Sequence, residues 1–111
     1  MMLEAEQKGE ALVVRVLADR IDAAVAAEFK ERMRDLGGGS GDRVIVDLSR
    51  VEFLDSSGLG AMVAVMKLLA PERRLELAGL TPGVLKLFRL TRMDGVFILH
   101  PTVPTDPQDA A

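Results

Sequence analysis

The first seventeen residues show the apolar pattern of two short strands. Branched apolar residues fill positions 11–17, and a weaker alternation of apolar and polar residues runs through 3–7. Such residues favour strands, so we predict one strand in each segment. Because Gly9 lies between the two segments, we expect an antiparallel hairpin that turns at this glycine.

From Asp22 onward the apolar residues recur every third or fourth position, which predicts a helix with one buried face. Asp22 lies where an N-cap residue belongs, because its carboxylate can accept hydrogen bonds from the free amides of the first turn. The glycine-rich run at 37–41 then ends this helix. The buried face is formed by Val25, Phe29, Met33 and Leu36.

Strand and helix patterns alternate through the rest of the chain. Branched and alternating apolar segments predict strands, while an apolar stripe at helical spacing predicts a long helix that Pro71 closes. Thr81-Pro82 is typical of the start of a short third helix. The predicted strands lie at 43–48, 74–78 and 95–99, and the long helix at 59–69.

Strands that alternate with helices favour right-handed crossovers and a mainly parallel sheet. We therefore predict the α/β class: a mostly parallel sheet with an N-terminal antiparallel hairpin and helices packed on it. A chain of 111 residues leaves little room for a second core, so we expect one domain at 1–100. Residues 101–111 contain frequent proline and no periodicity, and we expect a disordered C-terminal tail.

Composition and charge exclude several classes of function. The net charge of -3 and the pI of about 5.1 argue against nucleic acid as a partner. Without cysteine the chain has no disulfide and no thiolate metal site, and we expect no metal and no cofactor. The longest apolar stretch, 59–70, is too short to cross roughly 30 Å of hydrocarbon. No basic segment followed by an apolar core opens the chain, so we expect no signal peptide. We therefore expect a cytoplasmic protein that does not insert into a membrane.

Candidate chemistry gathers in the polar turn Asp55-Ser56-Ser57-Gly58, which lies just before the long predicted helix. From residue chemistry alone, Ser56 or Ser57 would cap that helix, a contribution of about 1 kcal/mol. A phosphate on such a serine would add roughly -1.5 to -2 charges. Because the N-terminus of a helix attracts negative charge, the domain is expected to tolerate this modification.

Residues 44–60, with the continuous core Asp-Ser-Ser-Gly-Leu-Gly at 55–60, resemble the signature of the sulfate transporter and anti-sigma factor antagonist domain, called STAS. The order and spacing of the predicted elements resemble that family to about residue 100. Short standalone STAS proteins with paired serines are bacterial anti-sigma factor antagonists. The resemblance implies that the serine immediately after the aspartate, Ser56, is phosphorylated by an anti-sigma factor that acts as a serine kinase.

The resemblance also implies a cycle of partners. The unphosphorylated protein would bind the anti-sigma factor and free a sigma factor, and a PP2C-like serine phosphatase would reset the switch. The chain itself would not be an enzyme. The implied partner-binding residues are Asp22, Asp55, Ser56, Ser57 and Gly58, together with the exposed side of the helix at 59–69.

The loop before the first helix differs from the family at two positions. Asp22 is similar to an aspartate that the family places near the phosphoacceptor. The family usually has Gly-Glu before the apolar residue and this aspartate, whereas this chain has Asp19-Arg20 before Ile21. Because the loop lies beside the binding surface in the family, the difference bears on which partner is bound.

Enzymatic alternatives lack necessary residues. A serine hydrolase needs a base, but His100 is the only histidine and no Gly-x-Ser-x-Gly elbow is present. A receiver-type phosphoacceptor at Asp47 would need an acidic pair after the first strand and a lysine after the last, and neither occurs. The run at 37–41 lacks the Gly-Lys-Ser or Gly-Lys-Thr of a phosphate-binding loop. We expect His100 to be a solvated or capping side chain, and Asp47 to hydrogen-bond near the end of its strand.

One alternative comes from within the family. STAS modules also serve as constitutive subunits of lipid-transport ABC complexes or as parts of larger signalling assemblies. Neighbouring genes would discriminate between these roles, because an adjacent anti-sigma kinase or serine phosphatase supports the switch and an adjacent transport ATPase contradicts it.

Overall fold

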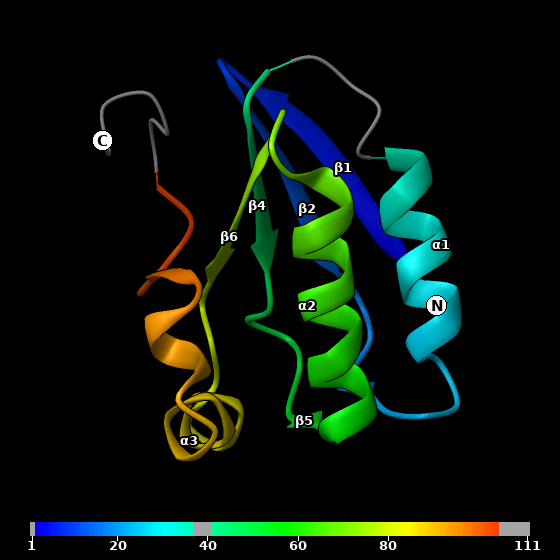
Figure 1. The fold of residues 1–111 in the computed structure, drawn as a ribbon, viewed down its shortest axis with the longest axis vertical. Helices are drawn as coiled ribbons and strands as arrows, with labels where there is room; N and C mark the ends of the chain where they lie inside the picture. The colour runs from blue at the N-terminus through cyan, green and yellow to red at the C-terminus, as the bar shows by residue number, and fades with distance from the viewer. Residues whose placement is uncertain (1, 37–40, 105–111) are drawn as a thin grey trace.

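The chain folds into a five-stranded sheet with helices packed against one face, in a computed structural model that describes residues 2–36 and 41–104 (Figure 1). The strand order is β1-β2-β4-β6-β7, and only the β1–β2 pair is antiparallel. The predicted α/β class, with an opening hairpin on a mostly parallel sheet, is therefore confirmed. The strands are β1 (Leu3–Lys8), β2 (Ala11–Val16), β4 (Arg43–Asp47), β6 (Arg74–Ala78) and β7 (Ile98–His100).

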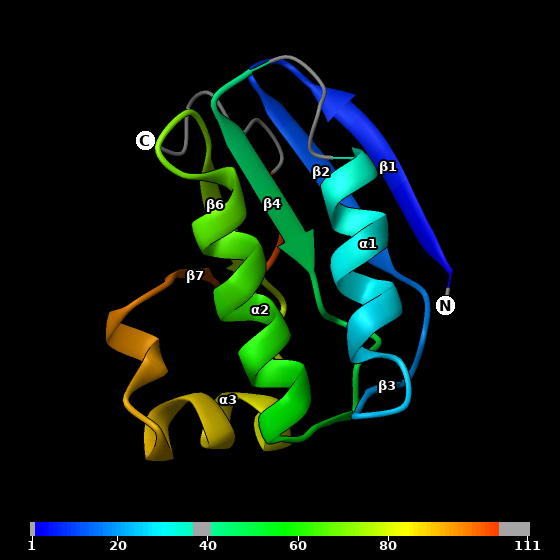
Figure 2. The ribbon, with the colours of Figure 1, turned by 45° about the vertical axis from the view of Figure 1, so that its right-hand side comes forward.

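The described part of the chain has three α-helices, which pack on one face and at one end of the sheet (Figure 2). Figure 2 shows α1 (Ala26–Leu36) and α2 (Ser56–Leu69) side by side on one face, while α3 (Pro82–Leu90) crosses the end of the sheet to which the carboxyl ends of the parallel strands point. Their apolar stripes bury Phe29, Met33, Met62 and Phe88 completely. Within the described ranges, no helix has the length and apolar character needed to cross a bilayer.

The first helix begins later than predicted. The Asp22 side chain accepts a hydrogen bond from the Ala24 N–H at 3.1 Å, and its carbonyl accepts from the N–H groups of Val25 and Ala26. Asp22 therefore begins a separate turn at 23–25, and α1 starts only at Ala26. The prediction that Asp22 is the N-cap of the helix is wrong, because its carboxylate is used by the turn. The predicted helix-ending run at 37–41 falls, except for Gly41, outside the described residues.

The last strand also differs from the prediction at 95–99. A short 3-10 helix, η1 (Met93–Gly95), occupies the start of that segment, and β7 begins at Ile98. Between them, the N–H groups of Val96 and Phe97 both donate to the Met93 carbonyl. Phe97 is buried and packs edge-to-face on Phe88 with ring centroids 5.7 Å apart. This aromatic contact holds the residue in the core outside the strand.

The helix-free face of the sheet carries a small second cluster. Ala11, Val13, Ile45 and Ala78 are fully buried there, and Val103 packs against them. Val103 lies in the segment predicted as a disordered tail. Of that segment, residues 101–104 are described, and 105–111 lie outside the described residues.

A second, two-stranded element was not predicted. β3 (Arg20–Ile21) pairs in parallel with β5 (Phe53–Leu54), with Arg20 opposite Phe53 and Ile21 opposite Leu54. Two-residue strands have no detectable periodicity, so the sequence gives no sign of this pairing. This pairing joins the loop before α1 to the loop before α2.

Candidate functional site

The β3–β5 pairing brings the Asp22 loop against the Asp55 turn. The Asp55 N–H donates to the Ile21 carbonyl at 3.4 Å, and the Ala23 N–H donates to Asp55 Oδ2 at 3.2 Å. The structure thus brings together the two acidic positions that the sequence analysis singled out.

Asp55, not a serine, caps α2. Its backbone is extended, with φ -99° and ψ -174°, and its Oδ1 accepts from the Gly58 N–H at 2.9 Å. Ser56 and Ser57 are the first two residues of the helix itself. The prediction that one of these serines caps the helix is wrong, because only the residue before the helix has the extended backbone that turns its side chain back over the first amides.

Both serines are exposed. Because Asp55 supplies the cap, neither hydroxyl is needed to start the helix, and both side chains lie on the solvent side of its first turn. The geometry therefore leaves an exposed pair of primary alcohols next to Asp55, whose carboxylate also binds the loop that carries Asp22.

Gly58 has a packing role in this arrangement. The residue is buried, and an added Cβ would collide with the Ile21 carbonyl oxygen and lie 2.7 Å from Leu54 Cδ1. Only glycine lets the helix approach β3 so closely. Gly58 therefore supports the site by letting the two loops touch, without offering a side chain to a partner.

Arg20 and Phe53 lie at the edge of the site and were not identified from the sequence as site residues. Arg20 Nε donates to Asp22 Oδ2 at 3.0 Å, and the guanidinium carbon lies 4.8 Å from the centre of the Phe53 ring. Phe53 is 45% exposed, which is unusual for a phenylalanine. Their contact depends on the β3–β5 register, so no local pattern could have revealed it.

The exposed side of α2 extends from the turn at 55–58 toward the other end of the helix. Gly60, Lys67 and Leu68 are exposed along this helix, and Ala64 is half-buried. A shallow hollow of about 220 Å³ lies between α2 and α1, lined by Lys30, Glu31, Arg34, Ala64, Val65 and Leu68. The two loops and this helix pair form one continuous region suited to contact with a protein.

A buried ionic cluster lies elsewhere, on the helix-free face. Glu76 is fully buried and accepts two hydrogen bonds from Arg43 at 2.8 Å, one from Arg74 at 3.0 Å, and contacts His100 Nε2 at 2.7 Å. Burial by itself raises the pKa of the Glu76 carboxyl, but the hydrogen bonds from Arg43, His100 and Arg74 outweigh it and lower the pKa to about 2. The expectation of a solvated or capping His100 is wrong, because β6–β7 pairing carries this residue to Glu76.

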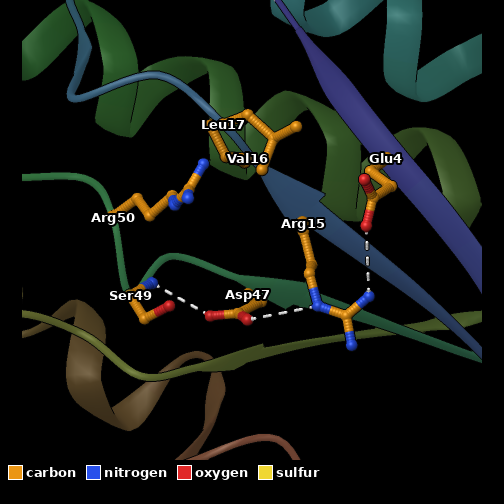
Figure 3. Close-up of a pocket in the computed structure, with 7 residues that line it drawn as sticks. All are labelled: Glu4, Arg15, Val16, Leu17, Asp47, Ser49 and Arg50. Carbon is orange, nitrogen blue, oxygen red and sulfur yellow. Dashed lines mark hydrogen bonds and ion pairs between the residues drawn. The ribbon is translucent and has the colours of Figure 1, made fainter.

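A polar hollow of about 350 Å³ lies at the carboxyl ends of β2 and β4 (Figure 3). Asp47 Oδ1 accepts from the Ser49 N–H at 2.9 Å, which confirms the expected hydrogen bond near its strand end. The other Asp47 oxygen lies 3.9 Å from Arg15 Nε, and Arg15 also reaches Glu4 at 3.6 Å. The Asp47 carboxylate is thus engaged by its neighbours. Within 2–36 and 41–104, no group of three metal-binding side chains is found.

Known proteins match most of the length of this chain. Residues 3–101 match the family model described as "Mlab, STAS domain". The anti-sigma-B factor antagonist of Listeria monocytogenes is 32% identical over 81 residues, which cover 72% of this chain and 71% of the relative.

Solved structures show the same fold. The crystal structure of an anti-sigma factor antagonist from Mycobacterium paratuberculosis has a TM-score of 0.84 at 27% identity, over 97% of this chain and 92% of that chain. The phosphorylated form of the Bacillus cell fate determinant SpoIIAA has a TM-score of 0.69 at 21% identity, over 99% of this chain and 100% of that chain.

Proposed function

This chain belongs to the STAS domain family, and on that premise we propose that it is an anti-sigma factor antagonist controlled by phosphorylation of Ser56. In the unphosphorylated form it binds an anti-sigma factor and so frees a sigma factor. It acts by binding rather than by catalysis. Because bacterial transcription takes place in the cytoplasm, this role agrees with the location expected from the sequence.

One observation carries the proposal: Ser56 is exposed at the first position of α2, while Asp55 supplies the helix cap. A kinase can reach an exposed hydroxyl without unfolding the domain. In the transfer, Ser56 Oγ forms a bond to the γ-phosphorus of ATP, the bond to the β–γ bridging oxygen breaks to release ADP, and the hydroxyl proton passes to a base of the kinase. The modified serine leaves the cap in place.

Phosphorylation is expected to act on the binding surface rather than on the core. A phosphate adds roughly -1.5 to -2 charges beside Asp22 and Asp55. The exposed position of Ser56 means that this charge remains hydrated, so folding is little affected. A partner that approaches the same surface meets both added bulk and added negative charge.

The partner surface we assign comprises the Asp22 loop, the turn at 55–58 and the exposed side of α2. Its continuity and its apolar members, such as Leu68, which is 48% exposed, favour a protein partner. The partners are an anti-sigma factor with serine kinase activity and, for the reverse step, a PP2C-like serine phosphatase. The Listeria and Mycobacterium relatives, which are named as anti-sigma factor antagonists, support this choice.

The test is phosphorylation by the cognate anti-sigma factor. The purified chain is incubated with the kinase and ATP, and the modified residue is located by mass spectrometry. We expect one phosphate on Ser56, its loss in Ser56→Ala, and its retention in Ser57→Ala. Modification found only at another residue would contradict the assignment. Binding to a transport complex that is indifferent to Ser56→Glu would instead favour a constitutive STAS subunit.

A further inference from the structure

Arg20 holds an unusual position at the edge of the site. Its Nε donates to Asp22 Oδ2 at 3.0 Å, and its guanidinium carbon lies 4.8 Å from the centre of the Phe53 ring. A guanidinium carries five N–H donors, but among the described residues only Nε has a hydrogen-bond acceptor. The two terminal nitrogens are therefore available to bind an anion.

Contacts between the two loops connect this cation to the residues beside Ser56. Arg20 is opposite Phe53 in the β3–β5 pair, and Ser56 follows Phe53 by three positions in the chain. Since a strand rises about 3.3 Å per residue, the α-carbons of Phe53 and Ser56 lie at most about 10 Å apart. Arg20 also donates to Asp22, and Ala23, the next residue, donates to the carboxylate of Asp55, which directly precedes Ser56.

Several carboxylates lie near the turn. Asp22 and Asp55 flank the serines, and Asp19 and Glu52 are neighbours through the hydrogen bond from the Glu52 N–H to the Asp19 carbonyl, at 2.7 Å. A phosphate on Ser56 would add negative charge to this group. Arg20 is the cation that the structure ties to the site, through its contact with Asp22.

The present partner of Arg20 is easily exchanged. The Arg20 and Asp22 side chains are 57% and 25% exposed, and ion pairs so open to water are weak. A phosphate carries up to twice the charge of a carboxylate and accepts two parallel N–H bonds from a guanidinium. The Phe53 ring meanwhile supports the flat face of the guanidinium, so that the cation stays near the turn.

From this geometry we propose that Arg20 is the phosphate-receiving residue of the switch, which exchanges the Asp22 carboxylate for the phosphate when Ser56 is modified. The proposal rests on the proposed function, because it concerns the modified form of Ser56. The exchange releases the Asp22 carboxylate, while the Phe53 ring keeps the guanidinium near the turn. Phosphorylation thus changes the shape of the partner surface as well as its charge.

The test uses protein in which phosphoserine is incorporated at position 56 during translation, so that no kinase is required. The phosphorus NMR signal is followed against pH in the otherwise native chain and in Arg20→Gln. A neighbouring cation favours the doubly charged phosphate, so the titration midpoint should rise by about half a pH unit when Arg20 is replaced. Arg20→Lys, which keeps the charge but not the two-pronged geometry, should fall between the two.

Arg50→Gln is the matched control, because it removes one positive charge from a residue that lines the hollow at the ends of β2 and β4 and leaves Arg20, Asp22 and Phe53 in place. Its midpoint should equal that of the native chain. Equal midpoints in the native chain and Arg20→Gln would overturn the proposal, as would an equal rise in Arg50→Gln, which would indicate only a general effect of net charge. Thermal unfolding of each variant confirms that the comparison is made on folded protein.

A second measurement follows Arg20 directly. The proton–nitrogen NMR signal of Arg20 Nε should move when phosphoserine replaces Ser56, and an unmoved signal would overturn the exchange. These results are independent of the kinase. If the anti-sigma factor modifies a different residue, the proposed function fails while the NMR measurements still decide whether Arg20 receives a phosphate at position 56.

Discussion

The Ala23 N–H donates to Asp55 Oδ2 at 3.2 Å, while the other oxygen of the same carboxylate accepts from the Gly58 N–H at 2.9 Å. One side chain therefore starts α2 and also secures the loop that carries Asp22. The start of the helix is therefore coupled to the position of Asp22. Because Asp55 supplies the cap, neither serine is needed to begin the helix.

Replacing Asp55 should test this double role. Asp55→Ala removes the cap of α2 and the acceptor for the Ala23 N–H, so we expect the free energy of unfolding to fall by about 1–2 kcal/mol. Ser57→Ala should change it by less than about 0.5 kcal/mol, because the serine is exposed and does not cap. Urea titrations followed by circular dichroism measure both. Equal losses in the two variants would show that a serine contributes the cap after all.

The two glycines of the first turns of α2 offer a matched pair. Gly58→Ala should destabilise the domain by about 1–3 kcal/mol, because the new methyl group would collide with the Ile21 carbonyl. An added Cβ at Gly60 meets nothing within 4 Å, so Gly60→Ala should stabilise the helix by about 0.5–1 kcal/mol. Thermal unfolding midpoints should therefore move in opposite directions. A shift of the same sign in both variants would refute the close approach of α2 to β3.

Charge at position 56 should weaken partner binding without loss of the fold. We expect Ser56→Glu to bind the anti-sigma factor about tenfold more weakly, a change of about 1.4 kcal/mol, because the glutamate adds bulk and negative charge to the binding surface. The effect should be smaller than that of a phosphate, which carries more charge. Ser56→Ala should bind like the native chain. Isothermal titration calorimetry gives the affinities, and unfolding curves give the stabilities. A non-cooperative unfolding curve for the glutamate variant would mean that the charge disturbs the core.

Ser57→Glu is the positional control for that experiment. It places the same charge one residue further along the exposed turn, and its effect on affinity should be smaller. A larger loss of affinity in Ser57→Glu than in Ser56→Glu would move the control point to the second serine.

Stability should fall in acid because of Glu76. Its pKa in the folded protein is about 2, below the ordinary value of 4.5, so the folded state favours the ionised carboxylate. The stabilisation it contributes is present above about pH 4.5 and is lost as the pH falls from there toward 2. Glu76→Gln should lower the free energy of unfolding by about 3 kcal/mol at neutral pH, because it removes the buried carboxylate that accepts two hydrogen bonds from Arg43.

Two variants test whether Glu76 causes the loss of stability in acid. In Glu76→Gln the decline in stability between pH 4.5 and 2 should be much reduced, whereas exposed Glu52→Gln should keep it. Urea midpoints measured at several pH values would show this. An unchanged acid decline in Glu76→Gln would assign the effect to other carboxylates.

Local patterns were sufficient for most of the elements. The opening hairpin turns at Gly9, whose φ of +59° lies in the left-handed region that glycine tolerates. The strand at 74–78 and the apolar face of α1 were also predicted, because period and residue type record which side of an element is buried. The continuous serine-containing turn identified the family in the same way, from neighbouring residues alone.

The details of the site depend on contacts between distant segments. Asp55 became the cap because β3–β5 pairing holds its backbone extended against Ile21. Arg20 reached Phe53 through the same pairing, and His100 reached Glu76 through the register of β6 and β7. None of these relationships has a local signature.

The sequence by itself thus determined the α/β class, the succession of strands and helices and the location of the polar turn, since each follows from periodicity over a few residues. The tertiary structure alone decided which side chain caps α2, which aromatic ring the Arg20 guanidinium contacts and which residues neutralise Glu76. The physical reason is that these depend on strand register and loop contact, which bring together groups whose separation along the chain leaves no pattern.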